Sequence, residues 1–439
     1  MVYCLGNGDD LMLNETVYAL GANRSCIREL FEYGNMRAAL VGRENVLDFS
    51  LGNPCIPAPA QVERAIRDIL DTLDPLSIHG YTSAPGDLAT RKAIAEDLNT
   101  RFDANAAPED LFIGCGAAPE LTAVFRALAV PDGEILAVAP FFPEYRPFAQ
   151  QAGLTFRVVP ADIPDFQLRL DALEEMLTPN TVALILNSPN NPSGTVYSRA
   201  TLEALSALLT QKSKQFGHPI YIVSDEPYRE LAYGVEVPFI PKLYPDTVIC
   251  YSYSKSLSLP GERIGYIYVP KQAADAQKLY TAIAGAARAM GHVCAPSLLQ
   301  KVIARCAGVR PDLQRYDENR QLLHRGLTEL GYETARPDGA FYLFVKAPGG
   351  SSKAFSEKAK QLDLLIVPGD DFGCPEYFRL CYCVSKETIL KSLPLFRQLI
   401  SEYFGREPIG SLLFLCILHY KKRNCLLYIF RFFVIMYGK

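Results

Sequence analysis

Short apolar runs alternate with segments of helical periodicity through the middle of the chain. Between residues 58 and 73, apolar side chains recur at every third or fourth position, which predicts an amphipathic helix. The apolar runs are typical of strands that are buried on both faces. These runs are residues 111–113, 134–139, 181–187, 219–224, 247–251 and 264–269. Strands that alternate with helices in this way predict an α/β fold with a doubly wound, mostly parallel sheet.

The pattern changes after residue 332, where short strands are expected at 340–345, 364–367 and 377–382. Helical segments lie between and after these strands, which is typical of a small α+β domain. We expect the segment before residue 50 to complete that domain. The expected division is an N-terminal extension at 1–14, a joining segment at 15–50, a large domain at 51–300, a small domain at 301–405 and an atypical tail at 406–439.

The tail holds apolar runs between residues 411 and 437, each shorter than the ~20 residues that a membrane-spanning helix needs. Basic residues interrupt these runs. Because the small domain is expected to be complete by residue 405 and an exposed apolar tail favours aggregation, we interpret the tail as an extension unrelated to the rest of the chain. Contact with a membrane or with another copy is the alternative. At the other end, Met1 to Leu11 lacks a helical or strand period, so Met12 is a second candidate start.

The composition indicates a reduced, cytoplasmic protein of about two domains, without a secretion signal. The 439 residues carry a formal net charge of −4, and the basic tail leaves the remainder more acidic still, which disfavours nucleic acid as a partner. The 12 cysteines and 5 histidines are dispersed, and no spacing among them resembles a metal site. Cys381 and Cys383 alternate along a predicted strand, which favours core packing over metal ligation.

Lys255 follows the apolar run 247–251 and lies among several serines. A lysine at the end of a buried strand is desolvated, so it loses its charge more easily and can form a Schiff base. Arg263 adds a planar cation, and Ser252 and Ser254 add hydroxyl groups, which together suit a phosphate monoester. The stretch therefore indicates an aldehyde cofactor that carries a phosphate.

The sequence S-x-S-K at 252–255, followed by G-E-R-I-G-Y at 261–266, resembles the lysine signature of class I/II pyridoxal-phosphate-dependent aminotransferases. The resemblance is to the aspartate-aminotransferase-like branch with fold type I, and it extends in collinear order from about residue 15 to 405. It implies that pyridoxal 5′-phosphate is bound covalently to Lys255. It also implies a homodimer that moves an amino group from an L-amino acid, aspartate by default, to a 2-oxo acid such as 2-oxoglutarate.

Two further segments suit the cofactor phosphate. Gly116, Ala117 and Ala118 join a predicted strand to a helix, and small residues there leave backbone N–H groups free to hold an anion. The resemblance identifies these three residues with the family's phosphate loop. It also identifies Tyr81, in the turn-rich loop 79–86, with a tyrosine that contacts the phosphate of the neighbouring subunit.

Three segments suit the cofactor ring. Asp225 ends a predicted strand, where a carboxylate can keep a pyridine nitrogen protonated and the ring an electron sink. The resemblance implies that Tyr228, in D-x-x-Y, lies near the ring oxygen and that Phe142 stacks on the ring. Asn191 begins a rigid N-P-S-G turn, and by resemblance it donates to the ring oxygen and helps to bind the substrate carboxylate.

Two residues are implied at the substrate carboxylate. Arg379 lies within a predicted strand and needs an anionic partner. That partner is either a structural carboxylate or, by resemblance, the substrate's α-carboxylate, which Gly52 is also implied to contact. Because fold alone does not determine the reaction, a C–S lyase that uses the same cofactor is the alternative function. A regulator that binds the cofactor without turnover is a third.

Overall fold

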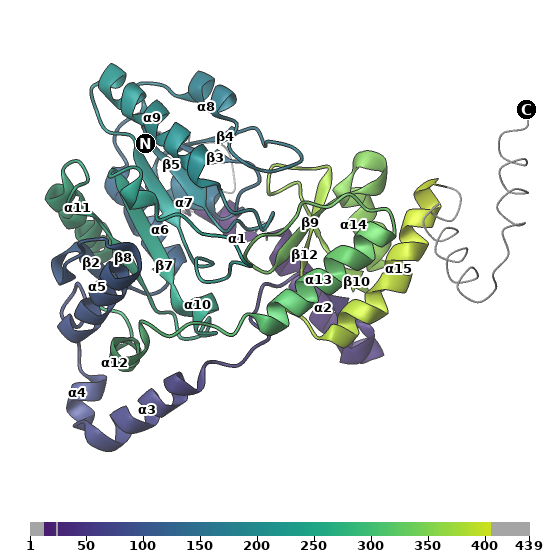
Figure 1. Ribbon diagram of the computed structural model, residues 1–439, viewed down its shortest axis with the longest axis horizontal. Coiled ribbons are helices and arrows are strands. Elements are labelled where there is room, and N and C mark those ends of the chain that lie inside the picture. Colours follow the sequence, from purple (N-terminus) through teal and green to yellow (C-terminus); the bar gives the residue numbers. More distant parts are fainter. Residues whose placement is uncertain (1–12, 23–24, 405–439) are drawn as a thin grey trace, which may run out of the picture.

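The computed structural model describes residues 13–22 and 25–404 of the chain. The larger of its two bodies is built on a seven-stranded sheet with the order β2-β8-β7-β6-β5-β3-β4 (Figure 1). Strands β3 to β7 pair in parallel, whereas β8 is antiparallel to both β2 and β7. The strands are β2 (Leu111–Gly114), β3 (Glu134–Val138), β4 (Thr155–Val159), β5 (Thr181–Asn187), β6 (Tyr221–Asp225), β7 (Thr247–Ser252) and β8 (Gly265–Tyr268).

Helices cover both faces of this sheet. The helices of this body are α3 (Ala60–Thr72), α4 (Pro75–His79), α5 (Leu88–Phe102), α6 (Ala117–Leu128), α7 (Tyr145–Ala152), α8 (Leu170–Met176), α9 (Arg199–Phe216), α10 (Tyr253–Ser256), α11 (Ala276–Ala289) and α12 (Ser297–Cys306). Of these, α3 and α4 pack against α12. Successive side chains of a strand point to opposite faces. In β5, Ile185 belongs to the apolar core under α6, α7 and α11, and Leu184 and Leu186 belong to the core under α8 and α9. The continuous apolar runs in the sequence follow from this double burial.

A second, smaller body lies beside the sheet. It contains the antiparallel sheet β11-β12-β9 and the parallel pair β1-β10. Its elements are β1 (Leu47–Asp48), β9 (Tyr342–Lys346), β10 (Leu364–Leu365), β11 (Val367–Pro368), β12 (Tyr377–Cys381), α13 (Gln314–Glu329), α14 (Ser352–Lys360) and α15 (Lys386–Phe404). Its core is rich in aromatic rings. Those of Phe355 and Phe378, for example, stack with their centroids 4.9 Å apart.

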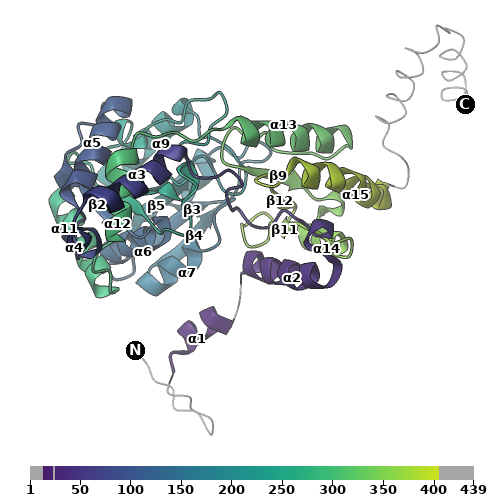
Figure 2. The ribbon, with the colours of Figure 1, turned by 90° about the horizontal axis from the view of Figure 1, so that it is seen from below.

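The chain reaches this body from its amino-terminal side. Helix α2 (Cys26–Val41) lies against β11 and α14, whereas α1 (Glu15–Ala22) extends away from both bodies (Figure 2). The Arg37 side chain fixes α2 through two hydrogen bonds to Asp363, at 2.7 and 2.8 Å. Short 3₁₀ helices complete the elements at η1 (Arg43–Asn45), η2 (Pro108–Asp110), η3 (Ile240–Lys242) and η4 (Pro348–Gly350).

The predicted fold class is confirmed, with differences in single elements. Strand β4 is absent from the sequence prediction because it lies at the sheet edge and its residues are mostly half-buried, so it forms no continuous apolar run. The run predicted as one strand at 364–367 is divided between β10 and β11, which belong to different sheets.

Three of the sequence predictions lie wholly or largely outside the described residues: the extension at 1–14, the start at Met12 and the tail at 406–439 with its membrane alternative. Within residues 13–22 and 25–404, no helix combines the length and the apolar character needed to cross a membrane.

Candidate active site

A cavity of about 420 Å³ lies between the carboxyl ends of the parallel strands and the smaller body. In doubly wound sheets this edge is where ligands bind. The cavity brings together twelve of the fourteen residues that the sequence predicted for the site. They are Gly52, Ala117, Ala118, Phe142, Asn191, Asp225, Tyr228, Ser252, Ser254, Lys255, Arg263 and Arg379.

The remaining two predicted residues do not line the cavity. Gly116 lies directly beside it, as the N-terminal cap of α6. Tyr81 lies in the loop after α4 with 87% of its surface exposed, and its side chain makes no hydrogen bond or ring contact with the described residues. Within one copy of the chain, the structure therefore does not bring Tyr81 to the site.

Lys255 lies in α10, which begins directly after β7. Its Nζ donates a hydrogen bond to the carbonyl oxygen of Gly52 at 2.7 Å and lies 5.5 Å from the centroid of the Phe341 ring. Burial lowers the pKa of Lys255 from its ordinary value, because the ammonium form loses its hydration. Among the described residues no carboxylate is within ion-pair distance of Nζ. The amine is therefore held in one place and is more easily deprotonated, as a nucleophile requires.

Asp225 ends β6 and is 5% exposed. The Tyr145 hydroxyl donates to its Oδ2 at 2.5 Å, and the side-chain amide of Asn187 donates to its carbonyl oxygen at 2.8 Å. Its Oδ1 is buried and has no hydrogen-bond partner within the described part of the chain. Burial raises the pKa of Asp225 to about 7, although the hydrogen bond from Tyr145 acts in the opposite direction. A buried oxygen without a partner fits a cationic donor, such as a protonated pyridine nitrogen.

Arg379 is 2% exposed and extends from β12 toward the same cavity. Its Nη1 donates to Oδ1 of Asn191 at 2.9 Å, and its Nη2 donates to the carbonyl oxygen of Ser50 at 2.5 Å. The guanidinium lies over the Tyr342 ring, 4.6 Å from its centroid. No carboxylate among residues 13–22 and 25–404 forms an ion pair with it. The structural salt bridge that the sequence left open is therefore absent from the described part, and the cation is available to an anionic ligand.

Tyr342, which the sequence analysis did not identify, lies against both Tyr228 and Gly52. The hydroxyl groups of Tyr228 and Tyr342 are 2.8 Å apart. A Cβ atom on Gly52 would overlap the Tyr342 hydroxyl. Only glycine therefore allows the backbone of this segment to pass so close to the ring, which places its carbonyl oxygen at Lys255.

Donors converge at the other end of the cavity. Gly116, with a φ of 88°, caps α6, whose first backbone N–H groups have no partner within the helix. The hydroxyl oxygens of Ser252 and Ser254 are 2.7 Å apart, and Arg263 Nη1 donates to Ser254 Oγ at 3.4 Å. A Cβ on Gly116 would lie 2.7 Å from the Arg263 guanidinium. A helix N-terminus, two hydroxyl groups and one guanidinium suit a phosphate dianion.

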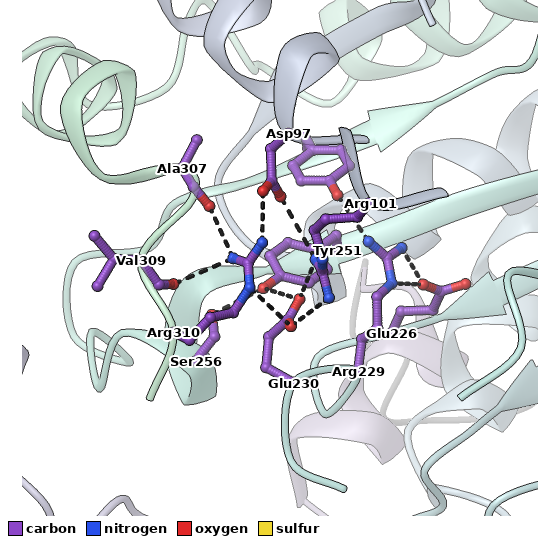
Figure 3. A network of polar contacts seen from close by, with 11 residues as sticks. Asp97, Arg101, Glu226, Arg229, Glu230, Tyr251, Ser256, Ala307, Val309 and Arg310 are labelled. Carbon is purple, nitrogen blue, oxygen red and sulfur yellow. Dashed lines mark hydrogen bonds and ion pairs between the residues drawn. The ribbon is translucent and has the colours of Figure 1, made fainter. Parts of the chain in front are cut away.

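A network of ion pairs supports the turn that carries Tyr228 (Figure 3). Arg229 forms a buried ion pair with Glu226. Glu230 forms an ion pair with Arg101 at 2.6 Å and accepts a hydrogen bond from the Tyr251 hydroxyl at 3.3 Å. The Tyr251 hydroxyl also lies 2.9 Å from Ser256 Oγ, in the helix of Lys255. The network thus joins the segments that carry Tyr228 and Lys255.

Sequence reasoning did not identify Tyr145, Tyr342 or Arg28 as site residues. Tyr145 and Tyr342 lie in aromatic-rich segments, where a buried ring is usually part of the core. Arg28 is on α2 and lines the cavity. Its local sequence predicts a helix but does not indicate which distant surface that helix faces.

Comparisons with known proteins agree with this geometry. A family model described as aminotransferase class I and II matches residues 44–393. The chain is 27% identical to aromatic-amino-acid aminotransferase 2 of Thermococcus litoralis, over 87% of this chain and 96% of that protein. Among solved structures, it is similar to an amino transferase from Eubacterium rectale with a TM-score of 0.88 and 53% identity, over 90% of this chain and 100% of that one. The chain is also similar to the structure of aspartate aminotransferase from Thermus thermophilus with maleate, with a TM-score of 0.79 and 26% identity, over 89% of this chain and 100% of that one.

The burial of Asp225 predicts that the ligand-free protein loses stability as the pH rises. The pKa of this carboxyl is about 7 in the folded chain and about 3.9 in an unfolded chain. Between these values only the folded state holds the proton, so the free energy of unfolding falls as the pH rises through this window. Asp225→Asn cannot ionise and should remove up to about 4 kcal/mol of this fall, at about 1.4 kcal/mol per pKa unit.

Urea unfolding between about pH 4 and pH 8 measures this difference. Glu144→Gln, which changes another carboxylate at the cavity, serves as the control. If Asp225→Asn and the unchanged protein show the same dependence on pH, Asp225 is not the group that titrates.

Proposed function

The chain belongs to the class I and II aminotransferases, an enzyme family that uses pyridoxal 5′-phosphate, and we propose that it moves an amino group from a dicarboxylic L-amino acid such as aspartate to a 2-oxo acid such as 2-oxoglutarate. The proposal of a dicarboxylic substrate rests on a fourth cation that lines the cavity. Lys255, Arg263 and Arg379 suit the cofactor aldehyde, the cofactor phosphate and the substrate α-carboxylate. Arg28 also lines the cavity.

Arg28 has no polar partner in the described part of the chain. It makes no hydrogen bond or ion pair there, and Ile27 and Phe31 line the cavity beside it. An unpaired guanidinium at a partly apolar wall suits a carboxylate through charge-assisted hydrogen bonds. The solved relative from Thermus thermophilus contains maleate, which is a dicarboxylate, and this supports the same substrate class.

The proposed roles follow from where each side chain lies. When bound, pyridoxal 5′-phosphate supplies an aldehyde that receives the amino group and a ring that accepts the electrons of a broken bond. Lys255 would hold the aldehyde, and as a free amine it would move a proton at the substrate α-carbon. Asp225 holds the proton of the pyridine nitrogen through Oδ1, the buried oxygen without a partner. Arg379 and Asn191 orient the substrate by its α-carboxylate.

The remaining proposed roles concern the ring and the phosphate. Phe142 would hold the ring by stacking, and Tyr228 would donate a hydrogen bond to the ring oxygen; both residues line the cavity. The phosphate is bound by the donors at the α6 end of the cavity. These donors are Gly116, Ala117, Ala118, Ser252, Ser254 and Arg263.

Absorption spectroscopy tests whether the protein catalyses transamination and whether the reaction depends on Lys255. The protein with added pyridoxal 5′-phosphate should show a visible band that aspartate removes and 2-oxoglutarate restores. Lys255→Ala should lack the lysine-dependent band and slow the conversion by at least about 10²-fold, because the proton carrier is gone. If amino acids leave the band unchanged, transamination is not the reaction. Pyruvate and ammonia as products would instead support the lyase alternative.

Substrate preference tests Arg28. Arg28→Gln should lower kcat/KM for aspartate by about 10- to 100-fold, since a hydrogen bond to a charged group contributes about 1.5–3 kcal/mol. The value for alanine should change little, because alanine has no second carboxylate. Glu29→Gln, an exposed neighbour on the same helix, is the matched control. Equal losses for both amino acids would show that Arg28 does not select the substrate.

We also propose that two copies of the chain form the active unit and that Tyr81 donates to the cofactor phosphate of the other copy. Its 87% exposure in one copy leaves the ring free for such a contact. Lys255→Ala and Tyr81→Phe should each lower activity. A mixed dimer of the two variants contains one site with both native residues, so mixing should restore activity. A mixture that stays as inactive as its components, or a monomeric mass in solution, would contradict this arrangement.

A further inference from the structure

Glu120 is a buried acid that the proposed reaction does not use. It lies in the first turn of α6 and is 2% exposed. Neither of its carboxyl oxygens has a hydrogen-bond partner in the described part of the chain. Burying an ionised carboxylate without a partner is far more costly than burying a neutral acid. The surroundings of Glu120 therefore favour its protonated form.

Two glycines leave space for this side chain. Gly114 of β2 and Gly265 of β8 are opposite each other in the sheet. A Cβ atom on either would lie 2.5 Å from Oε1 of Glu120, which is closer than Cβ atoms approach other groups. Both strands therefore need glycine at this level, and the carboxyl group occupies a space shaped by the sheet.

Four ionisable groups face Glu120 from the elements packed against it. They are Asp225 of β6, Cys250 of β7, Cys115 after β2 and Arg263 before β8. Arg263 is the single cation among them, and its Nη1 donates to Ser254 Oγ and to the carbonyl oxygen of Pro260. Burial and the negative charge of Asp225 raise the pKa of Glu120 well above its ordinary value, with Arg263 and the nearby backbone N–H of Gly116 acting in the opposite direction.

The carboxyl group lies one helical turn behind the proposed phosphate site. The backbone N–H of Glu120 approaches the carbonyl oxygen of Gly116 at 3.4 Å, so Glu120 is in the turn that the phosphate loop begins. A phosphate dianion at this loop would add negative charge on the far side of a single turn. Like charges at short range in a buried site disfavour ionisation.

We propose that Glu120 is an uncharged carboxylic acid in the cofactor-loaded protein and that it couples binding of the cofactor phosphate to uptake of a proton. This inference rests on the proposed phosphate site. Where ligand-free Glu120 is ionised, binding of the phosphate requires a proton from solvent. Cofactor affinity therefore falls as the pH rises, and Glu120 causes part of this fall. A glutamine at the same position cannot ionise, so it would remove that part.

Binding of pyridoxamine 5′-phosphate to the cofactor-free protein tests this coupling, since this compound carries the phosphate but no aldehyde for Lys255. Dissociation constants are measured by calorimetry from pH 6 to pH 9 for the native protein, Glu120→Gln and the control Glu144→Gln. The ratio of the native constant to that of Glu120→Gln should rise with pH, by up to about 10-fold for each pH unit above the ligand-free pKa of Glu120. Ionisation of the ligand itself cancels in the ratio.

Proton uptake gives a second readout. Calorimetry in two buffers of different ionisation enthalpy counts the protons taken up on binding, and the native protein should take up more than Glu120→Gln, by up to about one per site. Glu120→Met, of similar volume, replaces the glutamine variant if that one does not fold. A constant ratio and equal proton uptake would overturn the inference while leaving the proposed function intact. Absence of binding at every pH would instead contradict the proposed function.

Discussion

The cavity is built around buried ionisable groups that have no ion-pair partner in the described part of the chain. Lys255, Asp225 and Arg379 each retain hydrogen bonds to neutral groups, and these fix their positions without neutralising them. Buried charges of this kind disfavour the empty state, and a ligand that carries the complementary charges stabilises all three. The geometry of the site therefore follows from one constraint, which is that these three groups have no ion-pair partner in the described part of the chain and are available to a ligand.

The two bodies of the chain hold this arrangement together. Asp225 ends β6, and Lys255 lies in α10 directly after the adjacent parallel strand β7, so the sheet brings the two residues to the same edge. Arg379 comes from the smaller body and reaches the cavity through contacts with Asn191 and the backbone of Ser50. Gly52, two residues later, accepts the hydrogen bond from Lys255. A change in the relative position of the bodies would therefore act first on Arg379, the cation proposed to bind the substrate, and on the carbonyl group that accepts from Lys255.

The sequence predicted the part of the site that lies next to strands. Asp225 and Lys255 directly follow apolar runs, and the carboxyl ends of parallel strands meet at one edge, so local pattern and topology together place them. Tyr145 and Glu120 were not identified, because their positions depend on how helices pack on the sheet, which periodicity does not determine. Edge strand β4 was missed for a related reason, since partial exposure removes the apolar run on which the prediction relied.

The cofactor-suited groups and the remaining cavity wall come from different elements. This explains why similarity to known proteins determines the reaction and not the substrate. The groups suited to the cofactor lie on the sheet edge and the first turn of α6, and relatives named for aspartate and for aromatic amino acids match this chain at 29% and 27% identity. The wall that carries Arg28 belongs instead to α2, which is fixed to the smaller body by the Arg37 ion pair with Asp363. Because this helix contributes nothing to the sheet, its cavity-facing side chains can differ between relatives without disturbing Lys255 or Asp225. The role proposed for Arg28 would therefore make substrate preference a property of α2, to be determined from its side chains.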